Sequence, residues 1–155
     1  MAAAPAERTV LFAYDGSDAA KASIREAARQ LGAGRQAIVL SVWQPLRALA
    51  FSGVATVPRD FEAGFESQAA DVAREGAELA RSVGFAATPA TEVGEPIWRA
   101  IVEAADAHDA GIVVLGSHGR TGIGFVLMGS VAAAVARHTE RPVMIVHAPP
   151  AGGLD

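Results

Sequence analysis

The sequence contains no cysteine and a single lysine among its 155 residues. Without cysteine, a disulfide framework and a cysteine-based metal or redox site are excluded. The chain has 13 basic and 17 acidic residues, which give a net charge of −4, and no run of basic residues occurs. This charge pattern argues against binding of a nucleic-acid backbone. Long hydrophobic runs are also missing: "IVVL" and "VMIV" are far shorter than the roughly 18 apolar residues of a membrane-spanning helix. We therefore expect neither a nucleic acid nor a membrane as a partner.

The first ten residues, "MAAAPAERTV", lack the basic end and the apolar run of a secretory signal, so we expect a cytoplasmic protein. A chain of 155 residues has the size of one domain and is long enough to bury ~70% of its unfolded surface. We expect a single domain over residues 1–148, followed by a flexible tail over residues 149–155.

Short runs rich in Val, Ile and Leu recur along the chain and end at polar or glycine-containing junctions. Near-continuous apolar runs of this length are typical of parallel strands that are covered on both faces. The clear runs are "TVLFAYDGS" (9–17), "AIVLSVWQP" (37–45), "IVVLGSHG" (112–119) and "PVMIVHAPP" (142–150). A weaker strand over residues 87–94 makes five.

Helical patterns fill the segments between these strands. The predicted helices cover residues 18–32, 61–83, 95–111 and 130–140. The first begins at Ser17 or Asp18 and stops at Gly32, and the third has Pro96 in its first turn. This alternation predicts an α/β fold: an open, doubly wound, five-stranded parallel sheet, Rossmann-like, with helices on both faces. We expect the strands in the order 3-2-1-4-5. Residues 44–60 form the longest connection whose apolar residues show neither a helical nor a strand period. This connection is one of two things: a lid or partner-binding segment, or an ordered surface loop.

In such sheets, ligands bind outside the carboxyl ends of the strands, at the point where the strand order reverses. Three segments are expected to meet at this edge: Asp15 to Ser17, Val42 to Trp43, and the loop from Gly116 to Ser130. The loop, "GSHGRTGIGFVLMGS", holds five of the sixteen glycines and no acidic residue. Its composition suits the binding of a compact anion by backbone amides.

The loop fails two familiar phosphate motifs. It lacks the lysine of a P-loop, and Leu127 occupies the third glycine position of a dinucleotide fingerprint. The spacing that does fit is G-x-x-G, nine residues, then Gly129 and a serine at the start of a helix. Gly116 and Gly119 would allow positive φ and close backbone approach, while Gly129, Ser130 and Val131 would present free amides at a helix N-terminus.

With these residues the chain resembles the universal stress proteins, and specifically their ATP-binding branch. The resemblance extends from "VLFAYDGSDAA" through "IVLSVWQ" to "VVLGSHGRTGIGFVLMGSVAAAVARHTERPVMIVH", and its most specific element is G-x-x-G-x9-G-[ST]. It implies that Asp15 lines a nucleoside pocket, that Val42 contacts adenine, and that the glycine loop holds ribose and phosphates. The implied nucleotide-binding residues are Ala13, Asp15, Val42, Leu115, Gly116, Ser117, His118, Gly119, Arg120, Gly129, Ser130 and Val131.

Several of these residues have simpler interpretations. Asp15 would cap the first helix together with Ser17, as such residues commonly do at strand-to-helix turns. His118 is expected on the surface or beside a phosphate rather than as a metal ligand, because no other ligand residue stands at suitable spacing in its loop. Arg120 contacts a phosphate or is simply exposed, and Trp43 stacks on a base or covers the sheet end.

The resemblance further implies a regulatory, ATP-binding homodimer that acts in stress responses, with Mg²⁺ held mainly by the phosphates. An ATP hydrolase would need a residue that positions water and acidic ligands for Mg²⁺, and apart from Asp15 none is evident. Three alternatives stay open: a stress-related dimer that binds no nucleotide, a protein that binds another adenine nucleotide such as cyclic AMP, and a slow ATPase.

The last strand is expected at an edge of the sheet, and an unprotected edge is usually paired or covered. Family members dimerise through this strand, which implies a two-fold homodimer. The implied interface residues are Pro142, Val143, Met144, Ile145, Val146 and His147.

Overall fold

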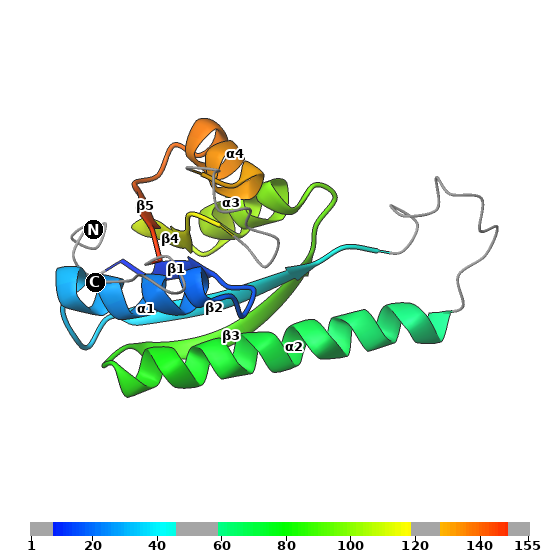
Figure 1. Cartoon of the computed structure of the whole chain (residues 1–155), viewed down its shortest axis with the longest axis horizontal. Helices are drawn as coiled ribbons and strands as arrows, with labels where there is room; N and C mark the ends of the chain where they lie inside the picture. Colours follow the sequence, from blue (N-terminus) through cyan, green and yellow to red (C-terminus); the bar gives the residue numbers. More distant parts are fainter. Residues whose placement is uncertain (1–7, 46–58, 119–127, 149–155) are drawn as a thin grey trace, which may run out of the picture.

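The computed structural model describes residues 8–45, 59–118 and 128–148 (Figure 1). The segment 46–58, which holds most of the long connection noted above, and the tail 149–155 lie outside the described residues. Strands and helices alternate along the described chain. They are β1 (Val10–Ala13), α1 (Asp18–Leu31), β2 (Gln36–Trp43), α2 (Arg59–Ser82), β3 (Ala86–Val93), α3 (Ile97–Ala107), β4 (Ile112–Gly116), α4 (Ser130–His138) and β5 (Val143–Val146).

The five strands form one sheet in the order β3-β2-β1-β4-β5, and every neighbouring pair is parallel. The predicted fold class and strand order are therefore confirmed. Four of the five strands, all but β3, are shorter than the apolar runs that predicted them. The first run extended to Ser17, whereas β1 ends at Ala13, because Asp15 to Ser17 form the turn into α1.

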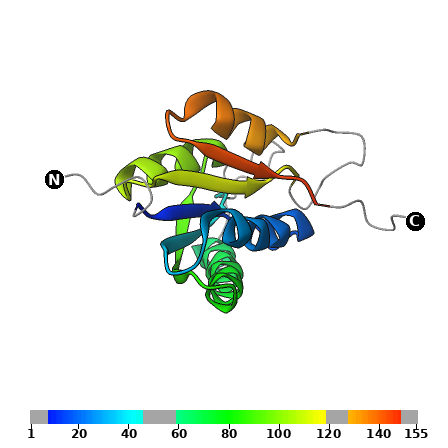
Figure 2. The ribbon, with the colours of Figure 1, turned by 90° about the vertical axis from the view of Figure 1, so that its left-hand side faces the viewer.

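Two hydrophobic clusters lie on opposite faces of the sheet. Helices α1 and α2 cover one face, and α3 and α4 cover the other (Figures 1 and 2). Successive residues of β1 alternate between the faces: Phe12 belongs to the first cluster and Leu11 to the second, and both are fully buried. This burial on both faces explains why the central strands lack a polar alternation.

The ends of α1 follow their predicted signals, whereas α3 is shorter at both ends than the predicted helix over residues 95–111. Helix α1 has Ser17 as its N-cap and Gly32 as its C-cap, where the glycine adopts a φ of 80°. Pro96 was expected inside the first turn of α3, but it is the N-cap, with an extended ψ of 164°. Among the described residues, no helix combines the length and the apolar composition needed to cross a membrane.

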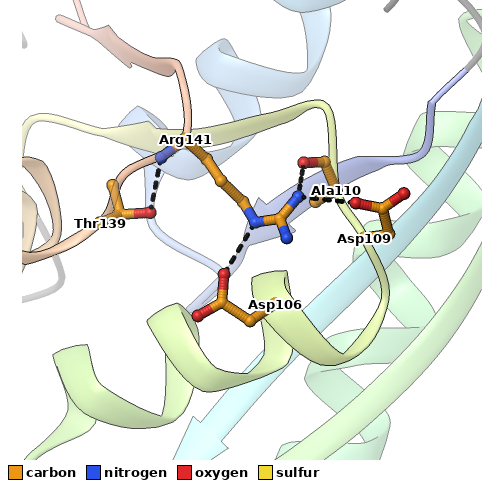
Figure 3. A network of polar contacts seen from close by, with 5 residues as sticks. All are labelled: Asp106, Asp109, Ala110, Thr139 and Arg141. Atoms are coloured by element: carbon orange, nitrogen blue, oxygen red, sulfur yellow. Dashed lines mark hydrogen bonds and ion pairs between the residues drawn. The ribbon is translucent and has the colours of Figure 1, made fainter. Parts of the chain in front are cut away.

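An arginine holds the start of β5 against the end of α3 (Figure 3). Arg141 Nε donates to Asp106 Oδ1 at 2.8 Å, and its guanidinium also donates to Asp109 Oδ1 at 3.2 Å and to the carbonyl of Ala110. Its own amide donates to Thr139 Oγ1 at 3.2 Å. The hydrogen bond to Asp106 raises the pKa of this guanidinium. These contacts fix the edge strand relative to β4 at the end of the sheet opposite the strand carboxyl ends.

Helix α2 has two different halves. Its first turns reach past the strands, where Phe61 and Phe65 are exposed (Figure 1). Its second half packs on the sheet through small residues, and the backbone at Gly76 comes very close to β1 and β2. A Cβ built on Gly76 would lie 2.7 Å from both Tyr14 Cδ1 and Val39 Cγ1. Glycine is therefore required at this contact for steric reasons.

Replacing Gly76 by alanine is expected to destabilise the protein by about 1–3 kcal/mol through overpacking, although alanine favours a helix interior by about 1 kcal/mol. Gly64→Ala is the matched control in the same helix, because a Cβ there meets no heavy atom within 4 Å. The control is expected to raise stability by up to about 1 kcal/mol. Urea unfolding followed by circular dichroism measures both changes, and a stabilising Gly76→Ala would contradict the packing described.

Candidate functional site

The strand register brings three strand ends to one edge of the sheet. Ala13 lies beside Leu40 on β2 and beside Leu115 on β4. Because β2 follows β1 in sequence on one side while β4 flanks β1 on the other, the strand order reverses between β1 and β4. This is the position where open α/β sheets bind ligands. Leu115 belongs to the buried cluster on the α3 and α4 face, and Ala13 and Val42 pack against this cluster.

Val42 lies near the end of β2, beyond the residues that pair with β1. Its Cγ1 atom would be 2.5 Å from a Cβ built on Gly94, so the side chain already packs closely where β3 ends and α3 begins. Val42 and the following Trp43 are both half-buried. The structure thus places Val42 at the predicted edge, and the two interpretations of Trp43 stay open.

The turn between β1 and α1 is closed by side-chain hydrogen bonds. Asp15 Oδ1 accepts the amide of Ser17 at 3.0 Å, and Ser17 Oγ accepts the amide of Ala20 at 3.2 Å. Gly16 between them has a φ of 79°, which favours glycine. Ser17 is therefore the N-cap of α1 as predicted, and Asp15 forms the turn that precedes it instead of capping the helix itself. Asp15 is half-buried, and its contact with a nucleoside stays a prediction.

Gly116 ends β4 and packs directly on the first turn of α1. A Cβ at this position would lie 2.7 Å from the carbonyl carbon of Ala19. Gly116 does not adopt a positive φ, so that part of the prediction was wrong. Its close backbone approach is to α1, because the end of β4 and the start of α1 touch where a side chain would collide. Glycine here brings the two segments of the site together.

Ser117 and His118 continue the chain from β4 at the same edge. The amide of Ser117 donates to the carbonyl of Val146 at 2.9 Å, and Ser117 Oγ lies 2.9 Å from His118 Nδ1. Ser117 is buried and His118 half-buried. Within residues 8–45, 59–118 and 128–148, no three His, Cys, Asp or Glu side chains are grouped to hold a metal ion. Gly119 and Arg120 lie outside the described residues.

Helix α4 begins beside the end of β4. Gly129 is its N-cap, and the Gly129 amide donates to the carbonyl of Ser117 at 2.5 Å. The prediction of a free amide at Gly129 was therefore wrong, because this amide closes the base of the glycine loop. Ser130 and Val131 follow in the first turn of α4. Since glycine has no side chain, the N-cap supplies no oxygen to their amides.

Sequence reasoning did not single out Tyr14, which immediately precedes Asp15. The Tyr14 hydroxyl donates to Glu75 Oε1 at 2.7 Å, and Lys21 Nζ lies 3.5 Å from the same oxygen. Burial raises the pKa of Tyr14 well above its ordinary value, and the hydrogen bond from Tyr14 to Glu75 and the Glu75 charge raise it further. Strand alternation could have placed Tyr14 on the α2 face, but the partner lies 61 residues away in sequence.

Tyr14 is the only tyrosine of the chain, so absorbance near the tyrosinate band reports its ionisation directly. We expect a native titration midpoint above the ordinary 10.0. Glu75→Gln should lower that midpoint but leave it above 10.0, because burial is the largest cause of the raised pKa. Folding raises the pKa of the Tyr14 hydroxyl above its unfolded value of 10.0. The protonated hydroxyl therefore contributes its full stabilisation of the fold below pH 10.0, and this stabilisation is lost as pH rises toward the folded pKa. Wild-type stability should therefore fall relative to Tyr14→Phe above pH 10.0, whereas a native midpoint at 10.0 would contradict the described environment.

Comparison with known proteins identifies the family. Residues 7–147 match the Universal stress protein family. Universal stress protein Rv1636 of Mycobacterium tuberculosis is 29% identical over 143 residues, which is 92% of this chain and 97% of the relative. The solved structure of MJ0577 from Methanocaldococcus jannaschii has a TM-score of 0.76 at 23% identity, over 92% of this chain and 97% of that one. A universal stress protein in complex with cAMP has a TM-score of 0.60 at 27% identity, over 91% of this chain and 97% of that one. This chain belongs to the universal stress protein family.

Proposed function

We propose that this chain is a regulatory protein that binds ATP at the carboxyl edge of its sheet and acts in the cytoplasm, as a homodimer, in stress responses. One arrangement carries the proposal: the hydrogen bond from Gly129 to Ser117 brings the start of α4 to the end of β4, beside the Asp15 turn. A nucleoside pocket and an anion site would thereby adjoin each other at the switch point of the sheet.

The site residues divide into two groups by their chemistry. Asp15, Ala13 and Val42 stand at the ends of β1 and β2 and would bind the nucleoside. The amides of Ser130 and Val131 would bind phosphate oxygens, because a helix N-terminus favours anions and Gly129 offers no capping oxygen. The N-terminus of α1 at the same edge is already capped by Ser17. The uncapped α4 is therefore the better phosphate site.

Two considerations favour binding over turnover. Within the described part of the chain, no cluster of three ligand side chains could hold Mg²⁺ by itself, so the phosphates would supply most of its ligands. Phosphoryl transfer also needs a group that positions the attacking water. Asp15 is the one acidic candidate that we identify, and one of its oxygens already accepts the Ser17 amide. We propose that hydrolysis is absent or slow.

Cyclic AMP is the second candidate ligand. The relative solved in complex with cAMP is 27% identical and covers 91% of this chain. The first-turn amides of α4 would suit its single phosphate as well as one phosphate of ATP. Mass spectrometry of nucleotides released from the purified, denatured protein would distinguish ATP, cAMP and an empty dimer, and phosphate release assays would detect a slow ATPase.

Calorimetric titration of the full chain with ATP is expected to give a Kd below roughly 1 mM. Asp15→Ala should weaken binding about tenfold or more, the usual scale for losing a hydrogen bond to a charged group. Asp18→Ala is the matched control: it removes the same charge from the first turn of α1, one residue inside the N-cap. It should leave the affinity nearly unchanged.

Asp15→Asn separates ligand binding from capping, because its amide oxygen can still accept the Ser17 amide. If the carboxylate contacts the nucleoside, Asp15→Asn should bind ATP weakly while its melting temperature stays close to that of the wild type. Wild-type protein that binds neither ATP nor ADP below the millimolar range would overturn the proposed function.

The homodimer proposal rests on the edge strand β5. Pro142 and Val146 accept the amides of Val113 and Ser117, each at 2.9 Å, so even-numbered residues of this strand pair with β4. The backbone groups of Val143 and Ile145 consequently point away from β4. Such an edge is a template for a second copy of the chain, related by a two-fold axis. The interface would comprise residues 142–147.

Ile145→Pro tests this edge, because proline removes an amide that points outward and leaves the pairing with β4 intact. Analytical ultracentrifugation should show a dimer for the wild type at micromolar concentration and a monomer for Ile145→Pro. Ile145→Ala loses the packing of the same side chain but keeps the amide, so it should remain dimeric. A monomeric wild type, or a dimeric Ile145→Pro, would count against pairing through β5.

A further inference from the structure

Tyr14, the residue that follows β1, contacts both β2 and α2. Its amide donates to the carbonyl of Leu40 at 2.8 Å, which continues the pairing with β2 one residue beyond the strand. Its ring lies against the backbone of α2, where a Cβ on Gly76 would be 2.7 Å from Tyr14 Cδ1 and 2.9 Å from Cε1. Its hydroxyl donates to Glu75 Oε1 at 2.7 Å. The sheet and α2 together determine where this residue lies.

Glu75 joins a third element to this contact. Lys21 Nζ of α1 lies 3.5 Å from Glu75 Oε1, the same oxygen that accepts the tyrosine hydroxyl. Tyr14 itself is 3% exposed, while the side chains of Lys21 and Glu75 are partly exposed. The hydroxyl contact is thus the buried part of a cluster that reaches the surface between α1 and α2.

The chain has little freedom between Tyr14 and the first turn of α1. Asp15 Oδ1 accepts the Ser17 amide at 3.0 Å, Gly16 has a φ of 79°, and Ser17 Oγ accepts the Ala20 amide. Asp15 therefore lies between Tyr14, which contacts α2, and the turn at Ser17, which caps α1. Because Tyr14 and Asp15 are consecutive residues, a displacement of the Tyr14 backbone would shift Asp15 as well.

We propose that the hydrogen bond from Tyr14 to Glu75 positions Asp15 for the nucleoside end of the ligand, so that α2 controls the affinity of a site to which it supplies none of the predicted ligand residues. This inference rests on the proposed binding of ATP. Tyr14 and Glu75 are positioning residues: Tyr14 points to the α1 and α2 face, whereas Ala13, Val42 and Leu115 face the opposite layer. The pair acts through the main chain at Asp15.

Calorimetry with the full chain tests the pair. Tyr14→Phe keeps the ring against Gly76 and removes only the hydroxyl, and it should weaken ATP binding about three- to tenfold, the range for one lost hydrogen bond. Glu75→Ala should have a similar effect. Glu75→Gln retains an oxygen that accepts the hydroxyl, so it should stay within about twofold of the wild type. Glu78→Ala, an exposed carboxylate on the same helix, is the matched control and should change nothing.

Two readouts separate positioning from a general loss of stability. Because Asp15 would contact the nucleoside that all three ligands share, Tyr14→Phe should weaken the binding of adenosine, ADP and ATP by the same factor. Glu75→Ala already removes the hydrogen bond from Tyr14 as well as the contact with Lys21, so the double variant Tyr14→Phe/Glu75→Ala should bind ATP no more weakly than Glu75→Ala. Circular dichroism at the titration temperature checks that each variant is folded.

The outcomes distinguish this inference from the function on which it rests. If the wild type binds none of the three ligands, the proposed function fails and the inference fails with it. If the wild type binds ATP but Tyr14→Phe and Glu75→Ala bind equally well, the positioning role is overturned while the proposed function stands. Additive losses in the double variant, or losses confined to ATP, would also overturn it.

Discussion

Parallel pairing of β1 with both β2 and β4 is the constraint on which the rest of the structure depends. The register sets Ala13 level with Leu40 on one side and with Leu115 on the other. Because parallel strands carry their carboxyl ends to the same edge, this pairing brings together segments about a hundred residues apart in sequence. The pairing is maintained by burial on both faces, where Phe12 and Leu11 are fully enclosed by different helix pairs. A one-residue shift of register would move these segments out of line and would turn Phe12 and Leu11 toward the opposite helix layers.

Close backbone contacts complete the site once the strands are paired. Gly116 lets β4 meet α1 at a distance that no side chain would allow, and Gly129 returns the chain to Ser117 through a 2.5 Å hydrogen bond. Both glycines therefore join elements of the fold, and in the proposed function the amides of Ser130 and Val131 would bind the anion. The candidate site thus lies where strand ends and helix N-termini come together, and the proposed nucleotide would bind there.

Helix α2 has a place in this arrangement that its sequence does not reveal. Its small residues allow it to lie directly on β1 and β2, and that closeness puts Glu75 within 2.7 Å of the Tyr14 hydroxyl. The same helix reaches past the sheet with Phe61 and Phe65 exposed. The contact from Tyr14 to Glu75 is the link through which α2 would act on the proposed ligand site.

The sequence by itself determined the fold class and placed each strand and helix to within a few residues, because apolar periodicity and capping residues such as Ser17 and Gly32 act over a few neighbouring residues. It also indicated the edge of the sheet at which Asp15, Val42 and Gly116 meet. Only the tertiary structure decided which groups at that edge are already engaged. The Gly129 amide is bound to Ser117, Gly116 packs on Ala19, and Tyr14 is tied to Glu75. These contacts join residues far apart in sequence, and local propensity carries no information about them because they exist only after the layers have packed.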